Sequence, residues 1–444
     1  MDWIKSTLFG SVIRRGTTIL TALTFVSYVL GLVRDVLFAH VLGASRVLDV
    51  YNAAFIIPDA LLSIFVASAL AAAFIPVFTG LRATGRESDA EHLAATTLAS
   101  APIVVAGIGV VAFIFMPQLA HFVAPGFSSS DLELFVRMSR LMLISPILFA
   151  ISNTLGSILV SLERFTSYGL SAVLYNAGII GGIFLVPYFG PMGLVVGMLA
   201  GAVLHLVARL IGLLRSSFRP KGPIKISDPH FREVLRLMVP RIAGQPIEQI
   251  TFFIFTRFAS VLAVGSIAIL NFARNFQAVP VSMFGISLAT ATFPALSRAA
   301  ARKDHAGFSR ALREASIPLI IVSVISMLVY MIFGKFIIGI FLGSGQFSDA
   351  NVRTTALLLS AFAISIPAES FIHLLVRAFY ALRDTWTPVL ISVPGLGLIW
   401  LITYILLPFT GIQAIGISYA ISMIVEVLIL WWLLSHKIAR LGTD

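Results

Sequence analysis

Residues 50–79 read VYNAAFIIPDALLSIFVASALAAAFIPVFT and carry a single charged side chain, Asp59. About 20 apolar residues in a helix cross the hydrocarbon core of a bilayer, and this stretch is longer than that. Similar runs recur along the whole 444-residue chain, which is 58% hydrophobic and 11% charged. Soluble domains are roughly 25% charged, so the composition excludes a soluble protein and a disordered one. The runs lack the alternation of a membrane β-barrel, and we therefore expect an all-α polytopic membrane protein.

The apolar runs predict about twelve membrane-spanning helices. A chain without cysteine has no disulfide, no thiolate nucleophile and no cysteine metal site. No cleavable signal peptide is evident before the first span. The predicted spans lie near residues 17–42, 50–79, 90–115, 132–161, 166–188, 191–214, 232–259, 265–296, 309–333, 350–381, 385–408 and 411–435.

Positive charge alternates from loop to loop between these spans. Cytoplasmic loops of membrane proteins carry the excess of Lys and Arg, so the charge-rich loops are expected to be cytoplasmic. This rule places both termini in the cytoplasm and requires an even number of spans. One side has only Arg46, Lys335 and Arg353; the other has Lys5, Arg14, Arg15, Arg82, Arg86, Arg164, Arg215, Arg219, Lys221, Lys225, Arg298, Arg302, Lys303, Arg383, Lys437 and Arg440.

The chain divides into two similar halves at its longest polar connection. Residues 73–78 (AFIPVF) resemble residues 292–296 (TFPAL), and a basic loop follows each. Other matched pairs also lie about 218 to 221 residues apart, so one register relates the halves. We expect an N-lobe at 1–215, a cytoplasmic linker at 216–230 and a C-lobe at 231–444. Parallel six-helix repeats around a central cavity are typical of alternating-access transporters.

Polar and ionisable side chains inside the spans concentrate in the first two helices of each half and in the tenth. Such groups are costly in lipid and normally face a cavity or a partner. Spans 3, 6, 9 and 11 have almost none in their middles, so we expect the first two helices of each half and the tenth to line a polar cavity. These groups are Arg34, Asp35, Asp49, Asn52, Asp59, Arg241, Gln245, Glu248, Arg257, Asn271, Arg274, Asn275, Ser365, Glu369, His373 and Arg377.

Some of these residues also have a purely structural interpretation. Asp49 could be an N-cap at the start of the second span. Arg34 and Asp35 could form an interfacial pair, although adjacent residues on a helix point about 100° apart and should not share a face. Arg274 has no acid three or four residues away, which weakens the structural interpretation for it.

Ion pairing within one helix is the structural alternative in spans 7 and 10. Arg241 with Glu248, and Glu369 with Arg377, could be pairs that only fix packing. His373 is expected to be a packed, hydrogen-bonded residue, because no second metal-type ligand stands at metal spacing. Gly193, Gly197 and Gly201, at four-residue steps, predict close helix packing in span 6.

Sequence motifs for enzymatic chemistry are missing. There is no G-x-x-x-x-G-K-[ST] phosphate-binding loop, no H-E-x-x-H and no G-x-S-x-G. We therefore expect a transporter and not an enzyme, with no cofactor and no nucleic-acid partner. The driving force would be the membrane potential or an ion gradient, Na⁺ or H⁺.

The motifs of the first two spans resemble the MurJ (MviN) family of lipid II flippases, in the MOP superfamily that includes the MATE exporters. They are GLVRD at 31–35, Asp49, AAF at 53–55, Ile57-Pro58 and AFIP at 73–76. The second half adds LRLMVP at 235–240, FAR at 272–274 and FPALS at 293–297. The resemblance covers nearly the whole chain.

This resemblance implies a site and a substrate. Arg34 and Asp49 match functionally important positions of the first lobe, and Arg274 matches the substrate-site arginine of span 8. Arg241, Arg257 and Arg377 could replace arginines that the family has and this chain lacks. Glu248, Glu369 and Asp49 are the candidates for ion coupling or ion pairing. No metal site is expected.

The chain also departs from the family. Tyr28 and Leu62 stand where family members usually have arginines, and Ala67-Ser68 replaces a Glu-Gly pair. Typical members carry two more C-terminal helices, which form a groove thought to hold the lipid tail. These departures leave the exact substrate open.

The resemblance implies a flippase of the bacterial inner membrane that moves a polyprenyl-diphosphate-linked peptidoglycan precursor, lipid II, to the outer leaflet. Its partners would be this lipid-linked glycopeptide, membrane lipids and cell-wall synthesis proteins. Two alternatives stay open. One is a MATE-like ion-coupled exporter of another substrate, and the other is a non-transporting scaffold of the cell-wall machinery. Acids should dominate an exporter's cavity, whereas membrane-embedded arginines are here at least as numerous.

Overall fold

The structure is a computed structural model that describes residues 2–67, 69–242 and 246–441. Within these ranges all regular structure is helical, because backbone groups in lipid must be satisfied inside the segment itself. The helices are α1 (Asp2–Leu42), α2 (Arg46–Leu62), η1 (Ser63–Ala67), α3 (Ala69–Ala83), α4 (Glu87–Ile114), α5 (Met116–Val123), α6 (Ser129–Met142), α7 (Ile144–Ser161), α8 (Phe165–Phe189), α9 (Met192–Leu214), α10 (Pro229–Ile242), α11 (Pro246–Ser260), α12 (Ser266–Pro280), η2 (Val281–Ile286), α13 (Ser287–Ala301), α14 (His305–Leu342), α15 (Asp349–Ala363), α16 (Ile366–Ala381), α17 (Trp386–Thr410) and α18 (Gln413–Leu441).

The described residues contain ten helical stretches long and apolar enough to cross a membrane. The pair α15 and α16, bent by 42°, would make an eleventh. The prediction of an all-α multi-pass membrane protein is thus confirmed. The predicted span 232–259 corresponds to α10 and α11, and residues 243–245 between them lie outside the described part, so that span stays a prediction.

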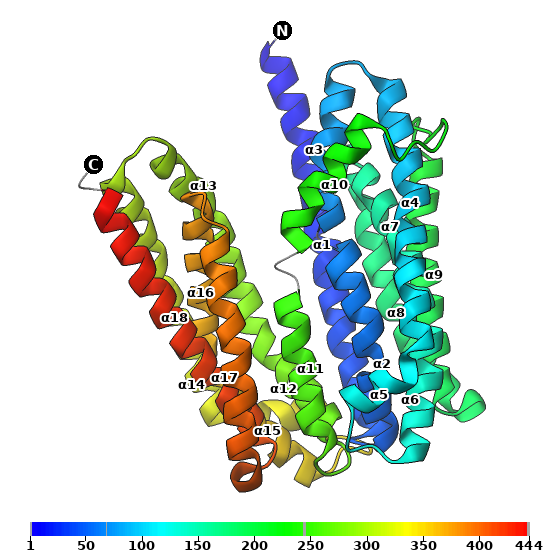
Figure 1. Cartoon of the computed structure of the whole chain (residues 1–444), viewed down its shortest axis with the longest axis vertical. Coiled ribbons are helices and arrows are strands. Elements are labelled where there is room, and N and C mark those ends of the chain that lie inside the picture. The colour runs from blue at the N-terminus through cyan, green and yellow to red at the C-terminus, as the bar shows by residue number, and fades with distance from the viewer. Residues whose placement is uncertain (1, 68, 243–245, 442–444) are drawn as a thin grey trace. The chain divides into compact units, whose positions relative to one another are not determined.

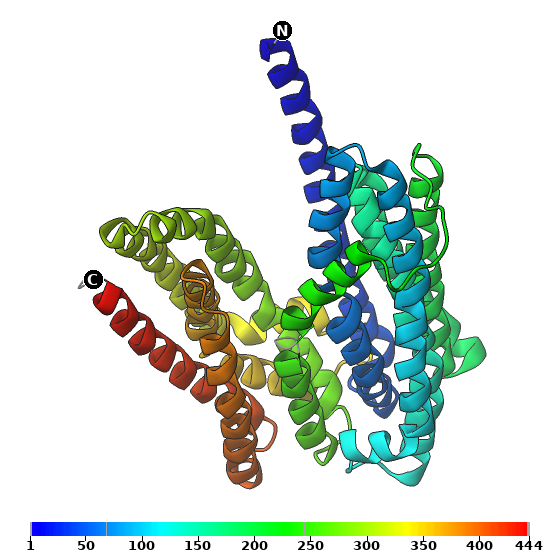
Figure 2. The same cartoon turned by 45° about the horizontal axis from the view of Figure 1, so that its top comes forward.

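The chain forms two compact units, which we describe separately. Unit 1 comprises residues 1–41 and 50–249, and unit 2 comprises residues 42–49 and 250–444. In unit 1, α7 packs against α4 and α9, and α8 packs along α9 (Figure 1). In unit 2, α18 packs against α15, α16 and α17, and α14 packs against α13, α15 and α16 (Figure 2).

The polar linker packs on unit 1. Phe218 from the linker and Phe231 from α10 join the buried cluster that contains Phe74 and Leu93. The backbone N–H of Lys225 donates to the Thr96 hydroxyl at 3.2 Å. The predicted lobe boundaries at 215 and 231 stay a prediction, because the compactness of one state does not show which segments move together.

Glycines allow α8 and α9 to touch through their backbones. A Cβ added to Gly197 would lie 2.1 Å from the Gly182 Cα, and one added to Gly178 would lie 2.2 Å from the Gly201 Cα. Any side chain at these positions would therefore force the helices apart. The predicted packing role of the span 6 glycines is confirmed.

Two π-helical turns, η1 and η2, interrupt equivalent helices of the two halves. They begin at Ser63 and Val281, which are 218 residues apart, within the offset range of the sequence repeat. Pro280 lacks an N–H, so the carbonyl of Phe276 loses its helical donor. The Tyr330 hydroxyl replaces it, donating to Phe276 O at 2.8 Å.

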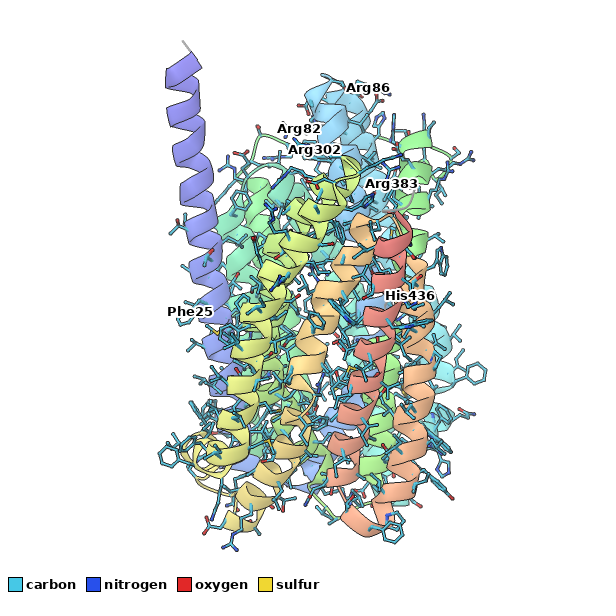
Figure 3. All side chains as sticks on the ribbon, turned by 90° about the vertical axis from the view of Figure 1, so that its left-hand side faces the viewer. Phe25, Arg82, Arg86, Arg302, Arg383 and His436 are labelled. Atoms are coloured by element: carbon cyan, nitrogen blue, oxygen red, sulfur yellow. The ribbon has the colours of Figure 1, made fainter. Side chains whose placement is uncertain are left out.

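Basic side chains mark the same end of the helices within each unit. In unit 1, Arg82 and Arg86 flank the α3–α4 turn; in unit 2, Arg302 and Arg383 follow α13 and α16 (Figure 3). Arg383 adopts a positive φ of 60°, which reverses the chain after α16. This arrangement agrees with the loop-charge pattern of the sequence.

Asp384 fixes the turn that follows, outside the spans. Its carboxylate accepts hydrogen bonds from the Thr387 N–H at 3.0 Å and from the Lys437 ammonium at 2.5 Å. Burial alone would raise the pKa of Asp384, but these hydrogen bonds lower it by a larger amount. The pKa of Asp384 therefore lies below its usual value. The turn thereby ties the start of α17 to the end of α18.

Candidate functional site

Arg34 lies in a polar cluster of unit 1 formed by α1, α2 and α8. Its guanidinium pairs with the adjacent Asp35 at 2.9 Å and reaches the Asn176 side-chain oxygen at 3.5 Å. Asn176 in turn donates to the Ser27 hydroxyl at 3.1 Å. The pair between Arg34 and Asp35, which was the structural interpretation of these residues, does form, because a long guanidinium side chain can bend back along the helix to reach a neighbour.

A second polar group of unit 1 joins α2 to the first turn of α11. The side chain of Gln249 hydrogen-bonds Asp59, and Glu248 lies within electrostatic range of the same carboxylate. Glu248 itself is exposed. The two acids are therefore neighbours, although they lie in separate spans of the sequence prediction.

Span 6 contains a buried basic network, so the expectation that its middle is nearly free of polar groups was wrong. Arg209 on α9 donates to Ser171 Oγ at 3.0 Å, to the Ser152 carbonyl at 2.8 Å and to Asn153 Oδ1 at 2.7 Å. His205, one turn earlier, meets the Ser152 hydroxyl at 2.7 Å. The i, i+4 spacing of His205 and Arg209 was the available signal.

Arg274 in unit 2 has an acidic partner on another helix. Its guanidinium lies 3.6 Å from the Glu369 carboxylate of α16, and their side chains are only 11% and 14% exposed. Gln277, one turn further on α12, accepts from Arg274 and donates to Glu369 at 2.7 Å. The absence of an acid on its own helix therefore did not leave Arg274 without one.

Three aromatic rings surround the Arg274 guanidinium. It lies 4.7 Å from the ring centroid of Tyr419, 5.7 Å from that of Phe362 and 5.8 Å from that of Phe252. Aromatic faces attract cations, most strongly where water is excluded. The Tyr419 hydroxyl also hydrogen-bonds both Arg274 and Glu369. The sequence prediction missed Gln277 and Tyr419.

Asp49 caps the helix that carries Arg274. Its carboxylate is 1% exposed and accepts from the N–H of Gly265 at 2.6 Å and of Ala268 at 2.9 Å, at the start of α12. Arg46 stands 3.8 Å away. Asp49 lies in the first turn of α2, and the helix that it caps is α12.

The other arginines predicted for the site have different surroundings. Arg377 donates to Thr290 of α13 at 3.0 Å and to its own helix, so it does not form the ion pair with Glu369 that was its structural alternative. Arg257 is half-buried in the last turn of α11. The side chain of Arg241 lies outside the described residues, so the ion pair with Glu248, its structural alternative, stays untested.

Each unit therefore holds an arginine–carboxylate pair within its spans. Guanidinium groups bind phosphate oxygens through paired, charge-assisted hydrogen bonds. A carboxylate already on the arginine keeps the site neutral until an anion replaces it. Among the described residues, no group of three or more His, Asp or Glu is arranged to hold a metal ion.

Two solved structures share this fold. The "Lipid II flippase MurJ, inward closed conformation" superposes with a TM-score of 0.80 at 22% identity, covering 96% of this chain and 90% of that one. An inward-facing MATE multidrug transporter of the MOP superfamily gives the same TM-score at 16% identity, covering 94% and 95%. The fold is thus that of the MOP transporters.

Comparison with sequence relatives shows to which family of this fold the chain belongs. The family model described as "Lipid II flippase MurJ" matches residues 38–442. A probable lipid II flippase MurJ of Vibrio cholerae is 30% identical over 395 residues, covering 84% of this chain and 73% of the relative. One from Buchnera aphidicola is 28% identical over 421 residues, covering 94% and 82%. The chain belongs to the MurJ family of lipid II flippases.

Proposed function

We propose that the protein moves lipid II from the inner to the outer leaflet of the bacterial inner membrane by alternating access. The observation that carries this proposal is the family match over residues 38–442. The diphosphate of such a lipid has about two negative charges, which suit arginines held in a low-dielectric interior. The protein acts as a transporter and not as an enzyme, and its role is in peptidoglycan synthesis.

The site residues follow from this proposal. Arg274 and Arg34 would contact the diphosphate in one or more states of the cycle, while the polyprenyl tail stays in lipid. Each arginine now contacts a carboxylate, Glu369 or Asp35, which the phosphate oxygens would displace. Energy would come from the membrane potential or from an ion.

Reconstitution tests the proposal directly. Purified protein in vesicles should move fluorescent lipid II between leaflets at a rate well above that of protein-free vesicles. Movement of another lipid-linked or cationic substrate, with none of lipid II, would favour a MATE-like exporter. No movement of lipid II by correctly inserted protein would contradict the proposal and favour a scaffold.

The orientation of the chain is part of the proposal, with both termini in the cytoplasm. Because the sequence has no cysteine, single cysteines can report on topology. Ser227 in the linker and Ser129 at the start of α6 are both exposed. Ser129 is preferred to Ser128, whose side chain makes a capping box with Asp131.

We expect a membrane-impermeant maleimide to label S129C in intact spheroplasts and S227C only in inside-out vesicles. The physical reason is the excess of basic loops on the side of Ser227. The cysteine-free parent is the control for background labelling. The reverse pattern would overturn the orientation and the direction assigned to transport.

A further inference from the structure

Glu426 on α18 is a buried acid that the proposed site does not use. It is 6% exposed and lies on the same face of α18 as Tyr419 and Ser422, at i, i+3 and i+7. Tyr419 hydrogen-bonds Arg274 and Glu369, and the Ser422 hydroxyl donates to the Gly395 carbonyl at 3.0 Å. The polar face of α18 thus leads from the candidate site to Glu426.

The hydrogen bonds around Glu426 indicate where its proton is. The hydroxyl of Ser392 lies 2.5 Å from Glu426 Oε1 and 3.0 Å from the Pro388 carbonyl. A serine hydroxyl has one proton, and neither a carbonyl nor a carboxylate can supply another. Both contacts are satisfied if Ser392 donates to Pro388 and a protonated Glu426 donates to Ser392.

The charges near Glu426 favour the same state. Among the described residues, the charged group that acts on Glu426 is Glu369 of α16, and its neighbours on α17 are the Ser392 hydroxyl and the backbone at Gly395. Within the described part of the chain, no basic side chain pairs with Glu426. A buried carboxylate in a membrane span that lacks a cation is strongly disfavoured, and protonation removes the charge.

Glu369 links this acid to the substrate site. When Arg274 pairs with Glu369 and Glu426 is protonated, the net charge of these three side chains is zero. When an anionic diphosphate binds Arg274, Glu369 loses its cationic partner while it lies near the carboxyl group of Glu426. A second proton, on Glu369, then removes the carboxylate charge that Arg274 no longer balances; the other titratable group of α16 that acts on Glu369 is His373.

We propose that Glu369 and Glu426 form a proton-binding pair, which holds one proton on Glu426 in the substrate-free state and takes up a second when a diphosphate displaces Glu369 from Arg274. One O–H bond breaks in a hydronium ion of the water phase and one forms on the carboxylate, with no change of oxidation state. Head-group binding and proton binding then favour each other, because linkage between two ligands is reciprocal. The second half of this inference rests on the proposed function, and the first half does not.

Infrared spectroscopy of the substrate-free protein tests the proton on Glu426. The wild type should show the C=O band of a protonated carboxyl near neutral pH, and E426Q should lack it. Glutamine also donates to Ser392, so this variant should keep the wild-type melting temperature. The matched control is E314Q, which alters an exposed acid on α14 of the same unit. A band equally strong in E426Q would overturn the assignment.

The pH dependence of lipid II binding, measured at the same pH on both sides of the membrane, tests the linkage. Wild-type affinity should rise as the pH falls, by up to about tenfold per pH unit, the limit for one linked proton. E369Q should bind tightly with a flat profile, because glutamine neither competes for Arg274 nor takes a proton, while E314Q should follow the wild type. A flat wild-type profile would overturn the linkage. Failure to bind lipid II at any pH would instead contradict the proposed function and leave the infrared result standing.

Discussion

Replacing Arg274 with alanine should weaken binding of the diphosphate head group by about 1.5–3 kcal/mol, or roughly ten- to a hundredfold. The guanidinium is held between Glu369, Gln277 and the Tyr419 ring, so its position is fixed before substrate arrives. Lysine should restore only part of the loss, because a point charge cannot reproduce a bidentate fork. The measurement is complementation of a flippase-depleted bacterium, with membrane levels of each variant determined in parallel.

The R274A experiment needs a control for folding, because Arg274 forms an ion pair with Glu369. R274A leaves Glu369 partly buried without its cation, so lost folding could be mistaken for lost binding. The double variant R274A/E369Q removes both charges, and it should accumulate normally yet still fail to complement. E369Q alone should still bind lipid II, since it keeps the arginine. If R274A and R34A both complement fully at normal levels, the diphosphate assignment is wrong and the scaffold interpretation gains support.

The sequence was sufficient for the fold class. Long apolar runs can form only helices in lipid, and the charge of the loops follows from the cost of moving basic residues across a membrane. The glycine steps of span 6 also predicted close helix packing, since small residues at four-residue spacing leave room for a backbone, and the partner in the structure is α8. These features are local, and local patterns can be read without a structure.

The pairing of site residues was less accessible, because it depends on contacts between helices. The pattern of α16 suggested Glu369 with Arg377, but Glu369 meets Arg274 of α12 and Arg377 meets Thr290 of α13. Arg209 escaped notice because a long apolar run outweighs one basic residue in any average. Its acceptors are hydroxyl, amide and backbone oxygens, which carry no charge that a sequence pattern would reveal.

Asp49 shows how such a contact governs the site from a distance in sequence. It lies 216 residues before Gly265, yet its carboxylate accepts hydrogen bonds from two backbone N–H groups at the start of α12. The same helix carries Arg274 two to three turns later. Because the first N–H groups of a helix have no partner within it, a buried helix start needs an acceptor from elsewhere. We infer that Asp49 is a positioning residue for the arginine.

Replacing Asp49 with alanine should destabilise unit 2 by roughly 2–6 kcal/mol, since two buried donors lose their acceptor at about 1–3 kcal/mol each. Replacing Asp49 with asparagine, whose side-chain oxygen is a neutral but good helix cap, should restore a large part of this stability. The measurement is the thermal unfolding of purified protein, together with transport. We expect both a lower melting temperature and slower transport, because the first turn of α12 would fray and Arg274 would lose its fixed position.

The matched control is Asp304→Ala, which removes another aspartate N-cap in unit 2. Asp304 is exposed and accepts from Gly307 N–H at 2.7 Å at the start of α14. This cap should be worth only about 1 kcal/mol, because water can replace it, and its loss should leave transport unchanged. An Asp49→Ala variant that is as stable as Asp304→Ala would show that the α12 cap contributes little. Normal stability with lost transport would instead assign Asp49 a direct part in the transport cycle.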